Sequence, residues 1–500
     1  MQRAKYISNG TITYKIVGEQ GPQGPQEEVG QQGPVGPQGP KGETYDDTEI
    51  KDKITKLSEK INFFVTPEMF GAKGDGVTDD TEAVQKAIDY AHTNKIKKVV
   101  FADKTYCANI IVYNDIELVG NGKATIKSVS GSNKDVIKSY DFDEMVGTTG
   151  TIPTDKGIRF FSIKHLIIDG NMDNNTSGYG IKLFGRNLYF FEVFVKNCAS
   201  GGIYTEFGTH NAPSVTDESF YGDLLESVFE RIKIYNCKGN GWTYKGPHDS
   251  HIKYLICVKC DGWAFYCTSG GVILENINTW FVSGGCYLGS GGFRLMNCQI
   301  DGGGYDGSDH RSNDGIRILD DCGNGFIKNT TIAGFNNGVV VGGLLHMLDY
   351  NVRDCNVGTV LNANNCILNV VASMCDTAYK LTKNGSFDVS GYIYECTNVF
   401  EGEEPKQYGN SSWRLVSNNT GQSYIQYSVQ NFYVNGWNPS YPKSNKAIIA
   451  QDTAPTHLER GGVLMQDAEK KTNESETMTG KDFNYIIQLL EWAGLANVLN

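Results

Sequence analysis

The stretch FGAKGDGVTDDTEAVQKAI, residues 70–88, joins a glycine-rich turn to an amphipathic helix. Asp79 is placed to cap the start of that helix, and Glu82 follows at the three-residue spacing of a capping box. The apolar face of the predicted helix consists of Ala83, Val84, Ala87, Ile88 and Ala91. The carboxylates of Asp75, Asp79 and Asp80 are therefore interpreted as turn and cap groups rather than catalytic ones.

Downstream of this helix the sequence carries a loose repeat of about 20–25 residues, the period expected of a solenoid. Each repeat holds a dipeptide that ends in Cys or Thr, then a turn with Gly, then a strand. The dipeptides are Asn197-Cys198, Asn236-Cys237, Lys259-Cys260, Asn278-Thr279, Asn297-Cys298, Asn329-Thr330, Asp354-Cys355, Met374-Cys375 and Glu395-Cys396. Because a buried Cys behaves as a small apolar residue, these side chains are expected to stack in one inward column.

Such a column explains seven of the 13 cysteines as free thiols without disulfides. The close pair Cys257 and Cys260 is followed by no second CxxC and by no His at zinc-ligand spacing. No metal and no cofactor is therefore predicted.

The same repeat sorts the strand after each glycine into two faces, because strand side chains alternate. The expected inward columns are Ile203, Trp242, Trp263, Cys286 and Ile316, and two places on Thr205, Tyr244, Phe265, Leu288 and Ile318. The outward positions are Tyr204, Glu206, Thr243, Lys245, Tyr266, Tyr287 and Arg317. An aromatic and charged face suits a sugar chain, which makes Tyr204, Lys245, Tyr266, Tyr287 and Arg317 the substrate-binding candidates. An ordinary solvated face or a subunit interface is the alternative.

The stretch at 70–88 closely resembles the opening motif of the pectate-lyase superfamily of right-handed β-helices. The length, the glycines, the Asp pair and the helix all match. The resemblance implies an all-β fold, a right-handed parallel β-helix over residues 66–403 whose first coil is capped by the helix. A small β-rich region is expected over 404–461, and a segment ending in a helix over 462–500.

The first 65 residues predict a trimer. Residues 1–20 are interpreted as an adaptor, with a β-like alternation over 11–17. Over 21–44, seven of eight consecutive triplets begin with Gly, which is typical of a collagen-like spacer and needs three chains. Over 45–65, Ile50, Ile54, Leu57, Ile61 and Phe64 follow the spacing of a coiled-coil seam, and Ile at both core positions favours three or four strands. A flexible linker and a single amphipathic helix are the alternatives.

An adaptor, a collagen-like spacer, a coiled coil and a β-helix together resemble a bacteriophage tailspike or tail appendage. The resemblance implies a homotrimer attached through its N-terminus to phage tail, baseplate or collar proteins. It also implies a virion protein that is made in the host cytoplasm and acts on bacterial surface polysaccharide at the host cell surface. Many such proteins cleave that polysaccharide.

Cleavage would need two carboxylates, about 5–5.5 Å or about 6.5–9.5 Å apart. The catalytic candidates are Glu206 on the outward face and Asp301, Asp309 and Asp314 in or beside the polar insertion 301–314. Asp217, in the insertion 208–227, is held in reserve. Because three coils separate Glu206 from the later insertion, Asp309 with Asp314 or Asp301 is the preferred pair. Hydrolysis is expected over elimination, since no carboxylate cluster with Ca²⁺-ligand spacing accompanies Lys245 or Arg317.

Composition limits the classes of partner that this protein can bind. The formal net charge is −12, which argues against nucleic acid, whose binding needs a basic surface. No apolar run is long enough for a membrane span. Three functions remain: a polysaccharide depolymerase, a non-catalytic receptor-binding appendage that grips a cell-wall glycan, and an architectural fibre segment. The aromatic outward face disfavours the third.

Overall fold

The computed structural model describes the solenoid over residues 64–150, 155–207, 226–289, 291–303, 313–362, 364–382 and 387–402. Elsewhere it describes single strands within the first 16 residues and between residues 412 and 464. The collagen-like segment, the coiled-coil seam before Phe64, Asp217, Asp309 and the C-terminal helix lie outside the described residues.

The chain divides into two compact units, Met1–Ser58 and Glu59–Asn500. In the first unit, β1 (Arg3–Ser8) and β2 (Thr11–Ile16) pair in antiparallel register, with Ser8 opposite Thr11. β2 confirms the strand predicted from the alternation at 11–17.

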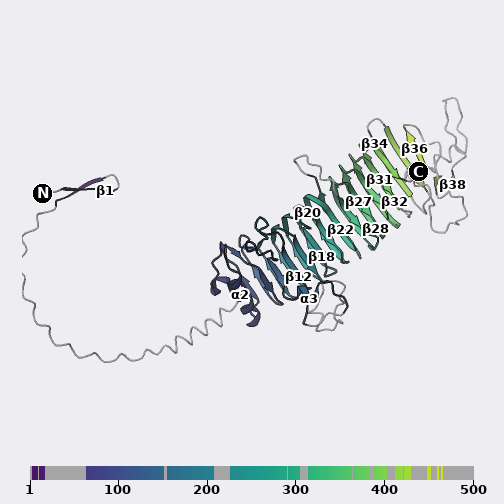
Figure 1. Cartoon of the computed structure of the whole chain (residues 1–500). Helices are drawn as coiled ribbons and strands as arrows, with labels where there is room; N and C mark the ends of the chain where they lie inside the picture. Colours follow the sequence, from purple (N-terminus) through teal and green to yellow (C-terminus); the bar gives the residue numbers. More distant parts are fainter. Residues whose placement is uncertain are drawn as a thin grey trace, which may run out of the picture. The chain divides into compact units, whose positions relative to one another are not determined.

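The second unit is a stack of coils whose strands pair in parallel with the coils before and after them (Figure 1). Three series of strands form three faces. The first face contains β4 (Lys98–Val100), β7 (Glu117–Val119), β10 (Phe161–Lys164), β13 (Leu188–Phe191), β16 (Val228–Glu230), β19 (His251–Lys253), β21 (Val272–Glu275) and β23 (Phe293–Met296). The predicted parallel β-helix is thereby confirmed.

The second face contains β5 (Thr105–Cys107), β8 (Thr125–Lys127), β11 (Ile167–Asp169), β14 (Phe194–Cys198), β17 (Lys233–Cys237) and β24 (Gln299–Asp301). The third face contains β6 (Ile110–Val112), β9 (Ile137–Ser139), β12 (Tyr179–Phe184), β15 (Gly201–Glu206), β18 (Trp242–Lys245), β25 (Asp314–Ile318), β27 (Asn337–Val341), β29 (Val357–Leu361), β31 (Thr377–Leu381) and β33 (Asn398–Gly402).

Long strands run round a corner and serve two faces. β20 (Ile256–Cys267) and β22 (Asn278–Leu288) serve the second and third faces. β26 (Phe326–Ala333), β28 (Leu344–Arg353), β30 (Asn364–Ser373) and β32 (Phe387–Tyr394) serve the first and second. β34 (Ser412–Asn419) adds to β32 in parallel, and β35 (Gln422–Val429) and β36 (Ala447–Gln451) continue in antiparallel pairing. β37 (Glu459–Arg460) pairs with β38 (Val463–Leu464).

The core consists of inward columns that run along the stack. On the first face, one column is Leu118, Ile163, Phe190, Phe229, Ile252, Leu274, Leu295, Ile327, Leu348, Leu368 and Val389, all buried. Each coil buries its apolar side chains only against its neighbours, so the core is continuous along the axis. Among the described residues, no helix is long and apolar enough to cross a bilayer.

The motif at 70–88 closes the first end of the stack. After η1 (Pro67–Phe70) and β3 (Asp75–Asp79), α2 (Thr81–Thr93) buries Val84, Ala87, Ile88 and Ala91 against the core. Asp75 accepts the N–H groups of Val77 and Thr78, and Asp80 accepts those of Lys73 and Gly74. The aspartates therefore hold turns, as predicted.

The predicted capping box is wrong in one respect. Asp79 accepts the N–H of Thr81, but Asp80 is the cap residue and the side chain of Glu82 forms an ion pair with Lys86 at 2.6 Å. Asp80 thus occupies the cap position while its side chain holds the preceding turn, and the side chain of Asp79 bonds to the first residue of the helix.

The Asn-Cys repeat marks a corner where the backbone turns with positive φ. Asn197, Asn236, Lys259, Asn297 and Asn329 have φ between 48° and 58°, a conformation that Asn tolerates better than most residues. Asn236 donates to Asn197 at 2.8 Å and Asn329 to Asn297 at 2.9 Å, so side-chain amides bridge successive coils.

This corner also corrects the predicted Cys and Thr column. In the coil of β22 the positive-φ residue is Phe281, not Asn278, so Val282 pairs with Cys260 while Thr279 pairs with Cys257. The stack Cys198–Cys237–Cys260 is thus interrupted by Val282. All 13 cysteines are nevertheless buried free thiols.

His346, at the start of β28, is a buried titratable group. Its Nδ1 accepts the N–H of Gly325 at 3.0 Å, and its Nε2 lies 2.7 Å from the carbonyl oxygen of Gly342, to which it donates. Burial lowers the pKa of His346, which keeps the ring neutral. Protonation would remove the acceptor used by Gly325.

The free energy of unfolding should therefore decrease as the pH falls below about 6.5, because the unfolded chain takes up a proton that folded His346 does not. We expect the His346→Phe variant to be less stable at pH 7.5 but to lose this part of the pH dependence. Urea unfolding at pH 7.5 and 5.5 measures both, with His248→Gln, at a half-exposed site, as the control. An unchanged slope in His346→Phe would contradict the assignment.

Candidate functional site

The third face carries an outward ladder in which each side chain lies beside its counterpart in the next coil. The ladder is Lys138, Lys182, Tyr204, Thr243, Tyr266, Tyr287 and Arg317, in that order along the axis. Four of the five predicted binding residues, Tyr204, Tyr266, Tyr287 and Arg317, belong to it. These four side chains are half-buried. We call the seven residues of the outward ladder the third-face ladder.

The register of one coil differs from the sequence prediction. Phe265, not Trp263, pairs with Trp242 and Cys286 in the inward column. The column of small residues that opens this face contains Gly202, Gly241, Ala264, Gly285 and Gly315, each packed against the backbone of the next. In this coil Ala264 occupies the position that glycine occupies in the others. The sequence prediction aligned the coil on Gly262 instead, and its register was therefore wrong by two residues.

The shift places Trp263 on the outside, where it forms an aromatic cluster. The rings of Tyr266 and Tyr287 stack with centroids 4.3 Å apart and planes at 19°, and the ring of Trp263 meets Tyr287 edge-on at 5.3 Å. Gly284 lies beneath the indole, since a Cβ there would come within 2.6 Å of it. Burial and the nearby Tyr266 raise the pKa of Tyr287, which stays a neutral phenol.

Tyr204, Glu206 and Lys245 form a second cluster. The Tyr204 hydroxyl donates to Glu206 at 2.7 Å, Lys245 Nζ lies 3.9 Å from the same carboxylate and 5.5 Å from the centre of the Tyr204 ring. Burial and the bond to Glu206 raise the pKa of Tyr204 well above its ordinary value.

Glu206 is not the exposed carboxylate that the alternation predicted. Only 3% of the residue is accessible, and its Oε1 accepts the N–H of Gly147. The short helix α3 (Phe142–Met145) leads into Gly147, and the ring of Phe142 packs edge-on against Tyr204. Glu206 therefore ties this segment to the third face.

The ladder continues toward the N-terminal end into a hollow of about 560 Å³. Lys138, Lys182, Asp135 and Tyr179 are among its lining residues. Lys182 Nζ lies 3.6 Å from Asp135 and 5.5 Å from the centre of the Tyr179 ring, which meets Tyr204 edge-on at 5.6 Å. A polar and aromatic surface thus extends without a break from β9 to β25.

The remaining carboxylates occupy two different settings. Asp314 is buried, accepts from the Nε of Arg317 and accepts from the amide of Asn337 at 2.7 Å. Asp301 is half-buried at the end of β24 and accepts the N–H of Gly303 at 2.9 Å. Burial raises the pKa of Asp301, although the bond from Gly303 opposes the shift.

Two of the four predicted catalytic carboxylates border the same loop. Asp301 and Asp314 flank the insertion 302–313, in which Asp309 lies outside the described residues. Glu206, on β15, lies three paired strands away from Tyr287, on β22, along the third face and is committed to Gly147, Tyr204 and Lys245. Among the described residues, no group of three or more His, Cys, Asp or Glu is placed to hold a metal ion.

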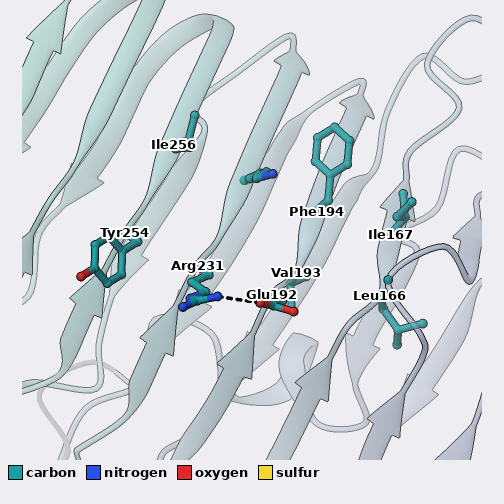
Figure 2. A pocket seen from close by; sticks show the side chains of 10 residues that line it. Leu166, Ile167, Glu192, Val193, Phe194, Arg231, Tyr254 and Ile256 are labelled. Atoms are coloured by element: carbon teal, nitrogen blue, oxygen red, sulfur yellow. Dashed lines mark hydrogen bonds and ion pairs between the residues drawn. The ribbon is translucent and has the colours of Figure 1, made fainter.

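A second hollow, of about 680 Å³, lies at the corner between the first and second faces (Figure 2). Figure 2 shows Glu192 and Arg231 joined across adjacent coils, at 2.9 Å, beside Tyr254, Phe194 and Ile256. Glu192 and Arg231 form an ion pair, Lys233 is a third charged lining residue, and the rest of the wall is largely apolar. It lacks the stacked rings of the third-face ladder.

Sequence reasoning missed three contributors to the site: Trp263, Tyr179 and the Lys138–Lys182 pair. Trp263 could have been found from the doublet Gly284-Gly285, because the first glycine of the doublet makes room for the ring. Lys138 and Lys182 belong to coils that precede the first Asn-Cys dipeptide, Asn197-Cys198, so the repeat could not be used to assign them to a face.

Parts of the chain are similar to known proteins. A family model described as Rhamnogalacturonase A/epimerase, pectate lyase-like, matches residues 65–202. The preneck appendage protein of Bacillus phage PZA is 26% identical over 273 residues, which are 49% of this chain and 29% of that protein. The capsule K30/K69-specific depolymerase 1 of Klebsiella phage K5-2 is 36% identical over 87 residues, 17% of this chain and 11% of that protein.

Among solved structures, the A-module of the Azotobacter vinelandii mannuronan C-5 epimerase AlgE4 superimposes with a TM-score of 0.49 at 17% identity, covering 72% of this chain and 100% of that one. The chain spans less than a third of the length of the two phage proteins. The fold is a parallel β-helix, and its N-terminal part, residues 65–202, is similar to the pectate lyase-like family model. Over part of its length, the chain is similar to preneck appendage proteins of Bacillus phages and to a capsule-specific depolymerase of a Klebsiella phage.

Proposed function

We propose that this protein is a virion-associated tail appendage that binds bacterial surface polysaccharide along the third-face ladder and degrades it. The observation that carries the proposal is the outward ladder of aromatic and cationic side chains along the axis of the solenoid, in which the buried Thr243 is the one exception among the seven members. A polymer lying along that axis would meet a new side chain at every coil, about 4.8 Å apart.

The chemistry of the ladder fits a sugar chain. Aromatic faces cover the C–H surfaces of sugar rings, and Trp263 and Tyr266, which both contact the ring of Tyr287, offer such faces. Lys245 and Arg317 stand at either side of this cluster and can donate to hydroxyl or carboxylate oxygens. The Klebsiella phage relatives, which are capsule-specific depolymerases by name, support a capsule-like polymer as the substrate.

Hydrolysis is the better-supported reaction. A glycosidase needs a carboxylic acid that keeps its proton, and burial raises the pKa of Asp301 in that direction. Asp301 is proposed as the general acid, with Asp309 or Asp314 of the same loop as the second carboxylate. Elimination needs a base, and neither Tyr204, whose pKa is raised, nor Lys245, held against Glu206, is free for that task.

Incubation of the protein with host surface polysaccharide tests the reaction. New reducing ends without ultraviolet absorbance are expected for hydrolysis, whereas absorbance from unsaturated products would replace it by elimination. Glu206 and Asp314 are both committed to internal partners, which favours the non-catalytic receptor-binding appendage as the second candidate. Binding to host cells with neither product would support that candidate.

Removal of a stacked ring should weaken glycan binding. We expect Tyr266→Ala and Tyr287→Ala each to raise the dissociation constant about fivefold, since one ring contact is worth about 1 kcal/mol. Calorimetric titration with purified polysaccharide measures the change. Tyr254→Ala, an exposed tyrosine at the other corner, is the matched control. Equal affinity in all three variants would exclude the third-face ladder as the binding surface.

A further inference from the structure

The proposed general acid does not belong to the third-face ladder. Asp301 is the last residue of β24 on the second face, where the preceding Ile300 is buried and Asp301 itself is half-buried and points outward. The backbone N–H of Asp301 donates to the hydroxyl of Thr279 in the coil before, at 2.9 Å. Because Thr279 also pairs with Ile300, the next residue of β22, Trp280, lies beside Asp301.

Asp301 is therefore one member of a line of outward side chains on the second face. In order along the axis, this line, which we call the second-face ladder, is Tyr235, Val258, Trp280, Asp301, Ala333 and Arg353. Neighbouring members lie about 4.8 Å apart, the spacing of paired strands. Trp280 is half-buried and Arg353 is exposed. The carboxyl of Asp301 thus has an indole ring on one side and a cation on the other.

The cation lies close enough to act on the acid. Ala333, the member between Asp301 and Arg353, has no side-chain atom beyond Cβ and does not separate the two. Burial raises the pKa of Asp301, while the bond from Gly303 and the positive charge of Arg353 oppose that shift. A ligand that contacts Asp301 would therefore also lie in the field of the Arg353 guanidinium.

We infer that the sugar chain is cleaved on the second face, held across Asp301 by Trp280 on one side and Arg353 on the other. A sugar ring that covers the indole of Trp280 would lie one coil, about 4.8 Å, from Asp301. Arg353 would donate to a hydroxyl or carboxylate oxygen of the following sugar. Trp280 and Arg353 have this role only if Asp301 is the acid, so the inference rests on the proposed function.

The reaction at this place needs only water as the second reactant. Asp301 gives its proton to the departing glycosidic oxygen as the bond to the anomeric carbon breaks. Water adds its hydroxyl to that carbon, and its remaining proton restores the acid. The third-face ladder then holds a neighbouring section of the polymer, on the other side of the insertion 302–313.

The kinetics of reducing-end release from host surface polysaccharide test the role of Trp280. We expect Trp280→Ala to lower kcat/KM about fivefold, and Trp280→Phe, which keeps a ring, to lose about half as much on a logarithmic scale. Tyr189→Ala is the matched control, because it removes an aromatic side chain that is 37% accessible on the first face. Equal kcat/KM in Trp280→Ala and Tyr189→Ala would overturn the inference and leave hydrolysis in place.

A second variant, Arg353→Gln, tests the other side of Asp301. Loss of a charged donor to the substrate should lower kcat/KM about tenfold. The falling limb of the pH profile should also move to higher pH, because the cation that lowers the pKa of Asp301 is removed while Asp354, which raises it, stays. Arg294→Gln, at an exposed position of β23 on the first face, is the control and should match wild type.

The outcomes separate the inference from the proposed function. An Arg353→Gln variant with wild-type kcat/KM and an unshifted limb would show that the substrate does not cross Asp301 in this way. A wild-type protein that releases no reducing ends would instead refute the proposed hydrolysis, and the inference with it. The shift of the limb is a change that a merely structural role for Arg353 would not produce.

Discussion

Replacement of Trp242 by alanine should lower the free energy of unfolding by about 3–5 kcal/mol, the cost of removing a large aromatic side chain from a packed core. Trp242 is fully buried in the third-face inward column. Its ring meets Phe229 at 4.9 Å and Phe265 at 6.0 Å, both edge-on, so two coils and two faces share these contacts. Its indole nitrogen donates to Thr205 at 3.1 Å, and the variant would leave that buried hydroxyl without this donor.

Denaturant unfolding followed by circular dichroism measures the loss. Trp280→Ala is the matched control, because the same side chain is removed at a half-exposed outward position of β22. We expect a loss of about 1 kcal/mol or less there, as for most substitutions outside the core. Similar losses in both variants would mean that the inward column does not carry the packing that its register implies.

Conversion of Asp301 to asparagine should reduce polysaccharide hydrolysis by roughly a hundred- to ten-thousand-fold, the usual contribution of a general acid. Asparagine keeps the shape of the side chain and can still accept the N–H of Gly303, so folding should be unaffected. Asp103→Asn, at an exposed loop of the first coils, is the control and should retain full activity. Release of reducing ends measures the rate.

The pH profile separates a catalytic from a structural role for Asp301. Because burial raises its pKa, the protonated acid persists to higher pH than that of an ordinary aspartate, and activity should fall as the pH rises through that pKa. This falling limb should be absent from the residual activity of Asp301→Asn. A variant with full activity, or one that keeps the same limb, would remove Asp301 from the mechanism.

Much of the fold could be predicted because single residues in the sequence mark the turns and corners of the chain. The turn aspartates at 75–80 and the positive-φ asparagines at 197, 236, 297 and 329 each satisfy a backbone requirement at their own position. The outward assignment of Tyr204, Tyr266, Tyr287 and Arg317 followed from alternation alone and is confirmed by the strand register.

The errors in the site have a different origin. Trp263 was misplaced because Ala264 substitutes for glycine in a column that only requires a small residue. Glu206 was expected on the surface because alternation does not reveal that Gly147, far earlier in the chain, packs over it. Likewise, the ion pair with Arg317 and the amide of Asn337 turn Asp314 inward. Contacts from segments outside the local strand, Gly147 and Asn337, contributed to the last two cases.

The thirteen buried thiols have a consequence for the lifetime of the protein outside a cell. Several stand within reach of one another, and the sulfur atoms of Cys257 and Cys260 are 3.4 Å apart. Burial raises the pKa of Cys267 and of Cys298 to about 12, so the reactive thiolate is scarce while the coils are closed. Once a coil opens in an aerobic medium, exposed sulfurs can cross-link in pairings that prevent refolding. The lifetime of the folded protein in such a medium is therefore set by its unfolding rate rather than by its free energy of unfolding.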